Sequence, residues 1–485
     1  MKSNSLRTPP IELTATLIGL PIATLLAIMA GNLTAHLVPD FGTGISFLIA
    51  LGFAVVIAAL SSMRTALLIL IVATGFSFGT SSFSGLEIRT TDLLLFIIAA
   101  QVLVYIFSHK VIFPKSMVLG AALIVFGAVI ASVAGPFTSI ALGRTAIRVL
   151  LPLFVIFATY LAIRSLRDLF VIVNLLAITV VGVSILSIAQ ITGLVPGLNP
   201  ADSGRANALF EHPNTLGIYL TVSVLVLIGV ISYNWKNLRS SSSMLMKIAV
   251  LMGITGILLS LSRGSYIGFS AGLLTIILLT AIRRNIFAAL SIVGVVALGV
   301  VFVLTFAPSQ PIEDVTNRIQ QIGQPDPNNI RAQIHRQAWR TITEYPLTGA
   351  GPLVFGNLVV ESTIVRQQER IAQVNAHNIY LEGYISVGLL GFFGILLLTL
   401  AAIQRLLRMQ KRSDRNSTLI QGVAVGIFGA LVANLLEGWV DAAFWQIEFA
   451  ALVAIFIGIA YALPRIVSDD SAPSSNLRES DYAVR

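Results

Sequence analysis

Apolar residues run through most of the chain in long, nearly uninterrupted segments that are separated by short polar turns. Each segment is close to the roughly 20 residues that a helix needs to cross a bilayer. The pattern predicts an all-α polytopic membrane protein with about 14 transmembrane helices, within a range of about 12–14. The predicted spans lie near 12–30, 44–60, 65–80, 92–108, 116–135, 145–163, 168–190, 214–233, 244–261, 264–282, 285–306, 379–403, 417–437 and 441–463.

The longest polar stretch, residues 307–378, divides the chain into its main parts. Residues 1–306 are expected to hold the first eleven transmembrane helices, and 379–463 the last three. Residues 464–485 are rich in Ser and charge and are expected to form a flexible cytoplasmic tail. A long loop with its own helices is usually functional, so 307–378 is interpreted as a catalytic or lid loop.

Two helices are predicted within this loop. Residues 330–344 carry apolar side chains at helical spacing, and Pro346 is expected to end that helix. Gly349 and Gly351 then predict a tight turn. A second polar helix is predicted over 358–373.

The composition supports the membrane interpretation. Hydrophobic residues make up 56% of the chain and charged residues 11%, whereas a soluble protein is about one quarter charged. The chain has no Cys, which excludes disulfides, thiolate nucleophiles and Cys-ligated zinc. The five His show no paired ligand spacing, so no metal and no cofactor are expected.

The net charge of +9 is interpreted through membrane topology and not as a sign of nucleic-acid binding. Placing both termini in the cytoplasm puts positive charge at every inner turn, and it puts 307–378 on the outer face. All six Lys then lie inside, and the cations on the outer side are all Arg. Arg offers a rigid donor fork for phosphate or carboxylate groups.

Several of these Arg residues lie close to the predicted outer membrane surface. Arg263 occupies a tight turn with Ser262 and Gly264, where a bound anion is the favoured explanation. Arg144 and Arg148 lie four residues apart at the outer end of the sixth span. They either contact a partner or extend along the span to the interface.

Histidine and carboxylate side chains near the outer face are the other candidates for chemistry. His377 lies where the long loop returns to the membrane, and a His at neutral pH is suited to accept a proton from a hydroxyl. A histidine at the start of a helix is the alternative explanation. Glu437, Asp441 and Glu448 lie near the last hairpin, and pairing with an outer Arg is favoured over acceptor binding or proton transfer.

Four motifs occur in order around the long loop, and together they resemble the O-antigen ligase and O-antigen polymerase superfamily of bacterial envelopes. They are Arg205 followed by Phe-Glu-His-Pro-Asn at 210–214, Ser-Arg-Gly at 262–264, Arg331 followed by Tyr-Pro-Leu-Thr-Gly-Ala-Gly-Pro at 345–352, and Ala-His-Asn-Ile-Tyr-Leu at 376–381 followed by Gly-Leu-Leu-Gly at 388–391. The sequence departs from the family at His335, where Trp is common; here Trp339 follows one turn later.

The resemblance implies a GT-C-like, inverting, metal-independent membrane glycosyltransferase. Its donor would be a glycan on undecaprenyl pyrophosphate, and its acceptor a lipid A core or another glycan, in lipopolysaccharide or exopolysaccharide biosynthesis. Arg205, Arg263 and Arg331 would bind the pyrophosphate, and His377 would activate the acceptor hydroxyl, which requires His377 and Arg263 to share one cavity. The supporting residues would be Asn214, Arg336, Arg340 and Asn378.

The resemblance places the protein in the bacterial inner membrane, among membrane lipids, with its active site on the outer, periplasmic face. Three activities within the family stay open: transfer to lipid A core by a ligase, transfer to a lipid-linked repeat by a polymerase, and transfer to a protein. A secondary transporter or lipid flippase is the alternative from another class. The lack of an internal repeat and the scarcity of acids within the spans count against it.

Overall fold

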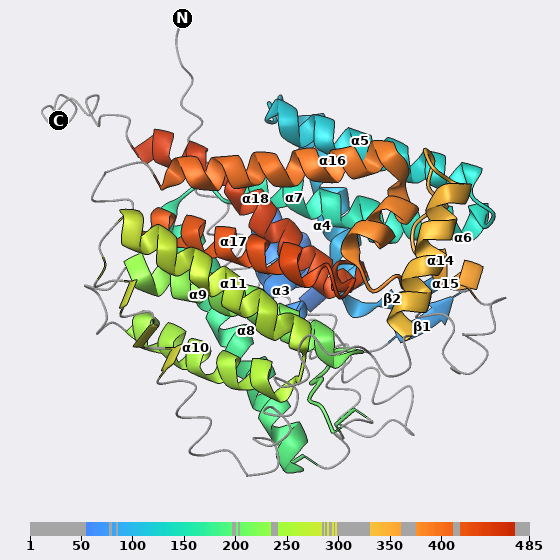
Figure 1. The fold of residues 1–485 in the computed structure, drawn as a ribbon. Coiled ribbons are helices and arrows are strands. Elements are labelled where there is room, and N and C mark those ends of the chain that lie inside the picture. Colours follow the sequence, from blue (N-terminus) through green and yellow to red (C-terminus); the bar gives the residue numbers. More distant parts are fainter. Residues whose placement is uncertain are drawn as a thin grey trace, which may run out of the picture.

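The computed structural model describes residues 55–76, 80–83, 86–195, 200–201, 204–233, 241–283, 330–359, 375–410 and 418–470, and isolated positions between 286 and 297. Within these residues the chain forms a bundle of long apolar helices, with two shorter helices and a two-stranded hairpin at one end (Figure 1). Ten of the described helical segments are long and apolar enough to cross a membrane. They support a polytopic helical membrane protein.

The ten candidate spans match ten of the predicted ones. Their helices are α4 (Thr90–Ser108), α5 (Lys115–Ala134), the continuous α6 (Thr138–Arg144), η1 (Thr145–Leu150) and α7 (Leu151–Ala162), α8 (Leu166–Thr192), α9 (Pro213–Tyr233), α10 (Ser241–Leu259), α11 (Arg263–Arg283), α16 (Ile379–Met409), α17 (Thr418–Glu437) and α18 (Ile447–Asp470). The spans predicted at 12–30, over most of 44–60 and over most of 285–306 lie outside the described residues.

Three boundaries differ from the sequence-based expectation. The sixth span begins at Thr138, because α6 and the π-helical turn η1 continue directly into α7. The last span begins at Ile447, because the residues before it form a turn and the short 3₁₀ helix η6 (Ala443–Trp445). The helix predicted over 65–80 is α3 (Met63–Ala73), of eleven residues.

The chain leaves α3 for a short β-hairpin, while the other described elements are helices, so the predicted all-α membrane class is retained. Strands β1 (Thr80–Phe83) and β2 (Leu86–Arg89) pair antiparallel. The segment after α3 is rich in Ser, Thr and Gly, which favour turns and short strands over a continuing transmembrane helix.

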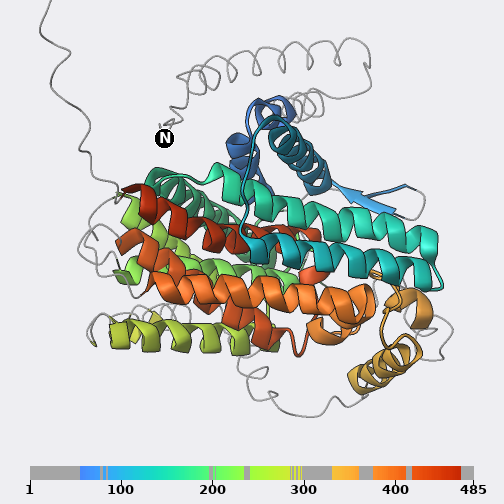
Figure 2. The ribbon, with the colours of Figure 1, turned by 90° about the horizontal axis from the view of Figure 1, so that it is seen from above.

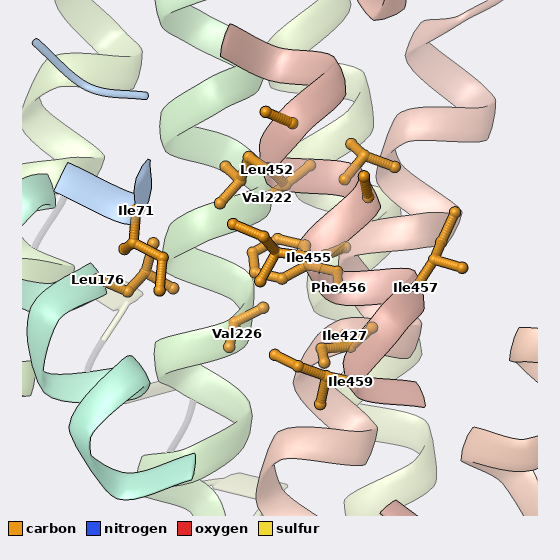
Figure 3. Close-up of a cluster of buried hydrophobic side chains, with 14 of the residues drawn as sticks. Ile71, Leu176, Val222, Val226, Ile427, Leu452, Ile455, Phe456, Ile457 and Ile459 are labelled. Atoms are coloured by element: carbon orange, nitrogen blue, oxygen red, sulfur yellow. The ribbon is translucent and has the colours of Figure 1, made fainter. Parts of the chain in front are cut away.

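Helix α9 forms the centre of the bundle. All 21 of its residues are buried, as expected for a helix that is apolar on every side. It packs against α10, α11 and α17, and α18 packs against α7 and α16. Figure 3 shows Val222 and Val226 of α9 beside the buried aliphatic and aromatic side chains of α17 and α18.

Helices α5 and α16 lie side by side along one side of the bundle (Figure 2). The two helices approach closely at Gly127 and Gly391. An added Cβ on Gly127 would lie 2.4 Å from the backbone N of Gly391, and one on Gly391 would collide with Val387 of its own helix. Small residues let helix backbones approach closely within a membrane. This contact fixes the position of α16, whose first residues carry part of the candidate site.

Helix α16 is interrupted near its start by Gly388, which has φ 64° and ψ −175°. In a continuous helix the carbonyl of Ile385 would accept from the N–H of Leu389. Here Ile385 accepts from Ala350 at 2.8 Å, and Leu389 donates to the carbonyl of Leu347 at 3.0 Å. The loop after α14 (Ile330–Glu344) therefore pairs with the backbone groups that the break exposes.

Replacing Gly388 with alanine should therefore destabilise the protein. The new Cβ would sit in a left-handed conformation and collide with the carbonyl oxygen of Thr348. We expect a loss of about 2 kcal/mol or more in the free energy of unfolding. Gly193→Ala is the matched control, since Gly193 also has a positive φ but no atom within 4 Å of the added methyl group. Thermal unfolding in one detergent should show the larger loss for Gly388→Ala; equal losses would contradict the role given to the loop contact.

Candidate active site

A polar cavity of about 260 Å³ lies at the end of the bundle where α11 and α16 begin and α17 ends. Helices α14 and α15 (Phe355–Val359) and the β-hairpin lie at this same end, at the right of Figure 1. The cavity is lined by Arg205, His212, Asn214, Leu261, Ser262, Arg263, Gly264, Arg331, Ile334, His377, Glu437, Val440 and Asp441. Arg205, Asn214, Arg263, Arg331 and His377, five of the predicted site residues, are thus brought together.

Arg205 is held in place by the protein on two sides. Its Nε donates to the carbonyl of Ser260 at 2.9 Å, and its Nη2 donates to Oδ1 of Asn214 at 2.6 Å. Two of its five N–H groups therefore fix the plane of the guanidinium at the cavity wall. An arginine oriented in this way needs little reorganisation to bind an anion.

Arg263 begins α11, and the turn before it points the start of this helix at the cavity. Ser262 accepts from the backbone N–H of Ser265 at 3.3 Å and acts as the N-cap. Leu261 has φ 49°, a strained conformation for a branched side chain that reverses the chain after α10. The backbone N–H groups and the positive end of the helix dipole lie beside the Arg263 side chain, an arrangement that favours a negatively charged ligand.

Arg331 reaches the cavity from α14, the predicted loop helix. This helix lies against the bundle through Ile334 and Ala338, which are buried together with residues of α15 and α16. The apolar residues whose helical spacing predicted this helix thus form the face of α14 that contacts the bundle. The second predicted polar helix falls mostly on 360–374, outside the described residues.

His377 lies in a tight turn immediately before α16. Its φ is 45°, and its backbone N–H donates to Oδ1 of Asn375 at 2.8 Å. The preceding N–H, of Ala376, donates to the buried carboxylate of Glu382 at 2.8 Å. Asn378 caps α16: its side-chain oxygen accepts from the backbone N–H groups of Tyr380 and Leu381. Its amide nitrogen also donates to the carbonyl of Trp439 at 3.1 Å.

Asp441 is the nearest carboxylate to His377, with 3.7 Å between its Oδ1 and the imidazole Nδ1. Its Oδ2 accepts from the amide Nδ2 of Asn214 at 2.6 Å. Burial raises the pKa of Asp441, but the neighbouring His377 and the donors of Asn214 and Ala442 outweigh burial and hold the pKa at about 2. The carboxylate is therefore ionised at neutral pH and faces the imidazole.

The expected pairing of outer acids with Arg holds for Glu448 and not for Asp441. Glu448 accepts from Arg89 at 2.8 Å, and Arg89 also pairs with Glu211. Asp441 instead contacts Asn214 and His377, so sequence reasoning missed its place in the site. The sequence offered one signal for this place: Asp441 lies four residues after Glu437, at the end of a predicted span, a spacing that can put two side chains on the same side. Both side chains line the cavity.

Other predicted residues have different positions. Arg336 and Arg340 are exposed on α14 and do not line the cavity. Asn378 acts as a helix cap. Arg144 contacts the carbonyl of Leu353 and the side chain of Asn357, and Arg148 forms an ion pair with Asp92 at 3.4 Å, so both have partners within the protein. Neither Arg336 nor Arg340 contacts the cavity, so their predicted supporting role gains no support from the geometry.

Two histidines contribute to the surroundings of His377. His212 lines the cavity, and its Nδ1 accepts from the backbone N–H of Asn214 at 3.1 Å, so its proton lies on Nε2. Burial lowers the pKa of His212, although Asp441 acts in the opposite direction. Burial also lowers the pKa of His335, whose imidazole lies against the backbone of His377 and Ala376. His335 is the residue that stands where the family often has Trp.

The depressed pKa of Asp441 predicts a stability difference that depends on pH. The folded value of about 2 lies below the ordinary 3.8, so ionised Asp441 stabilises the fold above about pH 4, and this contribution is lost as the pH falls through 2. Asp441→Asn should cost about 2 kcal/mol at pH 7 and about half of that at pH 3. Unfolding measured in one detergent at both pH values tests this; an equal difference at both would contradict it.

The comparisons with known proteins agree with the motifs. Residues 248–396 match the family model described as O-antigen ligase, a segment that includes Arg263, Arg331 and His377. No curated protein matches the chain. Arg205, Asn214 and Asp441 lie outside the matched segment, and the fold brings them to the same cavity as Arg263, Arg331 and His377. Residues 248–396 are therefore similar to the O-antigen ligase family, and this match supports a place for the chain in the O-antigen ligase and O-antigen polymerase superfamily.

Proposed function

We propose that the protein transfers a glycan from undecaprenyl pyrophosphate to an acceptor hydroxyl at this cavity, in the manner of an O-antigen ligase. The observation that carries this proposal is the convergence of Arg205, Arg263 and Arg331, from three separate elements, beside the pair of His377 and Asp441. A pyrophosphate leaving group carries dense negative charge, and charge-assisted bonds from arginine stabilise it as it departs. This arrangement supports transfer without a metal ion.

His377 is the proposed base. Its Nδ1 faces Asp441, which leaves Nε2 to accept the proton of the acceptor hydroxyl. The acceptor oxygen then attacks the anomeric carbon while the bond between that carbon and the pyrophosphate oxygen breaks. Asp441 stabilises the imidazolium that forms, and the arginines bind the departing undecaprenyl pyrophosphate. A single displacement of this kind inverts the configuration of the anomeric carbon.

An apolar groove of about 160 Å³ next to the cavity supports a lipid-linked substrate. It is lined by side chains of five of the candidate spans, among them Ile124 of α5, Leu153 of α7 and Val453 of α18, and by Trp445 of η6. The start of α16 separates the groove from the cavity, since Tyr380 lines the groove and His377 lines the cavity. An isoprenoid chain in this groove would leave its pyrophosphate close to the arginines.

The charge distribution supports a location on the outer face of the bacterial inner membrane. Basic residues concentrate in the short turns that are assigned to the cytoplasm, and the same assignment puts both termini on that side. The cavity lies at the other end of the described spans, which this assignment puts in the outer leaflet. Undecaprenyl-linked glycans and their acceptors would meet the protein there.

Transfer by purified protein tests this function. A fluorescent undecaprenyl-pyrophosphate glycan is incubated with the protein in detergent and EDTA, with lipid A core, with a second lipid-linked glycan, or with no acceptor. We expect transfer that survives EDTA, and the acceptor that supports it distinguishes a ligase from a polymerase. Loss of transfer in EDTA would contradict the metal-independent mechanism. No transfer to any acceptor, with movement of the lipid across vesicles, would favour a flippase instead.

A further inference from the structure

One side chain, that of Asn214, joins the arginine and carboxylate parts of the cavity. Its Oδ1 accepts from Nη2 of Arg205, and its Nδ2 donates to Oδ2 of Asp441, both at 2.6 Å. Asp441 in turn faces Nδ1 of His377 at 3.7 Å. A continuous path of polar contacts therefore runs from a proposed pyrophosphate ligand to the proposed base.

The chemistry of the two neighbours explains why an amide occupies this position. A guanidinium only donates hydrogen bonds, and an ionised carboxylate only accepts them. A group between them must accept on one side and donate on the other, which the Asn amide does in a single fixed orientation. A carboxylate at this position would repel Asp441, and an aliphatic side chain would leave both neighbours without this contact.

The position of Asn214 makes this contact rigid. Asn214 lies in the first turn of α9, the helix with every residue buried, and the residue itself is 9% exposed. Its backbone N–H is held by Nδ1 of His212. A displacement of Arg205 or Asp441 is therefore transmitted through the amide and is not absorbed by movement of a flexible side chain.

We propose that Asn214 is a positioning residue that couples occupancy of the pyrophosphate site at Arg205 to the Asp441–His377 pair. This inference rests on the function proposed above. In the empty site Arg205 polarises the amide, and the amide binds Asp441 strongly, because hydrogen bonds in a chain strengthen one another. A pyrophosphate bound to Arg205 partly neutralises its charge and weakens this pull. More of the charge of Asp441 then acts on His377, so the base is strengthened when the donor is in place.

A double-mutant cycle measures this coupling. Arg205→Lys keeps the charge but removes the rigid fork, and Asp441→Asn removes the charge beside His377. The two substitutions are made singly and together, in the wild-type background and in the Asn214→Leu background, and kcat/KM is measured with the fluorescent donor. With Asn214 present, we expect the combined effect to differ from the product of the single effects by about fivefold or more. In the Asn214→Leu background the effects should multiply.

Asn357→Leu is the matched control, because Asn357 also accepts from an arginine, Arg144, but lies outside the cavity. This variant should leave kcat and the donor KM unchanged, whereas Asn214→Leu should lower kcat and raise that KM. The same cycle is repeated with the Kd of undecaprenyl pyrophosphate, which needs no turnover. Independent effects in the presence of Asn214, with active wild-type protein, would overturn the coupling alone; a wild type without transfer or binding would overturn the proposed function as well.

Discussion

Replacing His377 with alanine should abolish most glycan transfer and leave donor binding intact. General base catalysis contributes about 10²–10⁴-fold to a rate, so a loss of this size in kcat is expected. The Kd for undecaprenyl pyrophosphate should change little, because the arginines proposed to bind it come from the loop before α9, from α11 and from α14. Stopped assays with the fluorescent donor give kcat, and equilibrium binding gives Kd.

His109 provides the matched control for this variant. It follows α4, at the end opposite Arg89, and stacks on Tyr105, away from the cavity. His109→Ala should keep full transfer and full binding. Wild-type kcat in His377→Ala, with an acceptor that the wild-type protein uses, would show that another group accepts the proton.

Replacing Arg263 with alanine should have the opposite pattern, with loss of donor affinity first. A hydrogen bond to a charged group contributes about 1.5–3 kcal/mol, which corresponds to about 10–100-fold in Kd. Transfer should fall further, because the same guanidinium is proposed to stabilise the charge on the departing pyrophosphate. Arg263→Lys should recover part of the affinity, since lysine keeps the charge and loses the two-pronged geometry.

Arg336→Ala is the control for charge alone. Arg336 lies on the exposed face of α14 and outside the cavity, although the sequence suggested a supporting role. Its removal should leave Kd and kcat within about twofold of wild type, because the hydrogen bond it makes, to the carbonyl of Ala332, is within its own helix. A loss as large as that of Arg263→Ala would mean that the general positive field of the loop, and not the geometry of the cavity, binds the donor.

Much of the bundle could be predicted because a membrane imposes length and composition on each span. The ten described spans and the loop helix 330–344 follow from apolar runs and from helical spacing. The β-hairpin and the break at Gly388 did not follow. Both depend on contacts with distant residues: Arg89 pairs with Glu211 and Glu448, and the break at Gly388 is filled by the loop after α14.

The sequence identified the arginines and the histidine of the site, but it did not identify which side chains contact one another. Arg263 and His377 are separated by more than 100 residues, and the sequence alone left open whether they share a cavity. They do, because α11 and α16 begin at the same end of the bundle. The link between Asp441 and His377 depends on a second contact between distant segments. The N–H of Ile379 donates to the carbonyl of Gly438 at 2.7 Å, which brings the turn of His377 to the end of α17.

The central claim is that this cavity binds the pyrophosphate of the donor, and photocrosslinking tests it most directly. An undecaprenyl-pyrophosphate glycan with a diazirine on the isoprene unit nearest the pyrophosphate is bound, irradiated and mapped by mass spectrometry. We expect labelling of the start of α11, the 437–441 turn and the start of α16, with competition by undecaprenyl pyrophosphate. His377→Ala should retain this labelling, and Arg263→Ala should lose it. Labelling elsewhere on the bundle, or labelling of this cavity that persists in Arg263→Ala, would contradict the account.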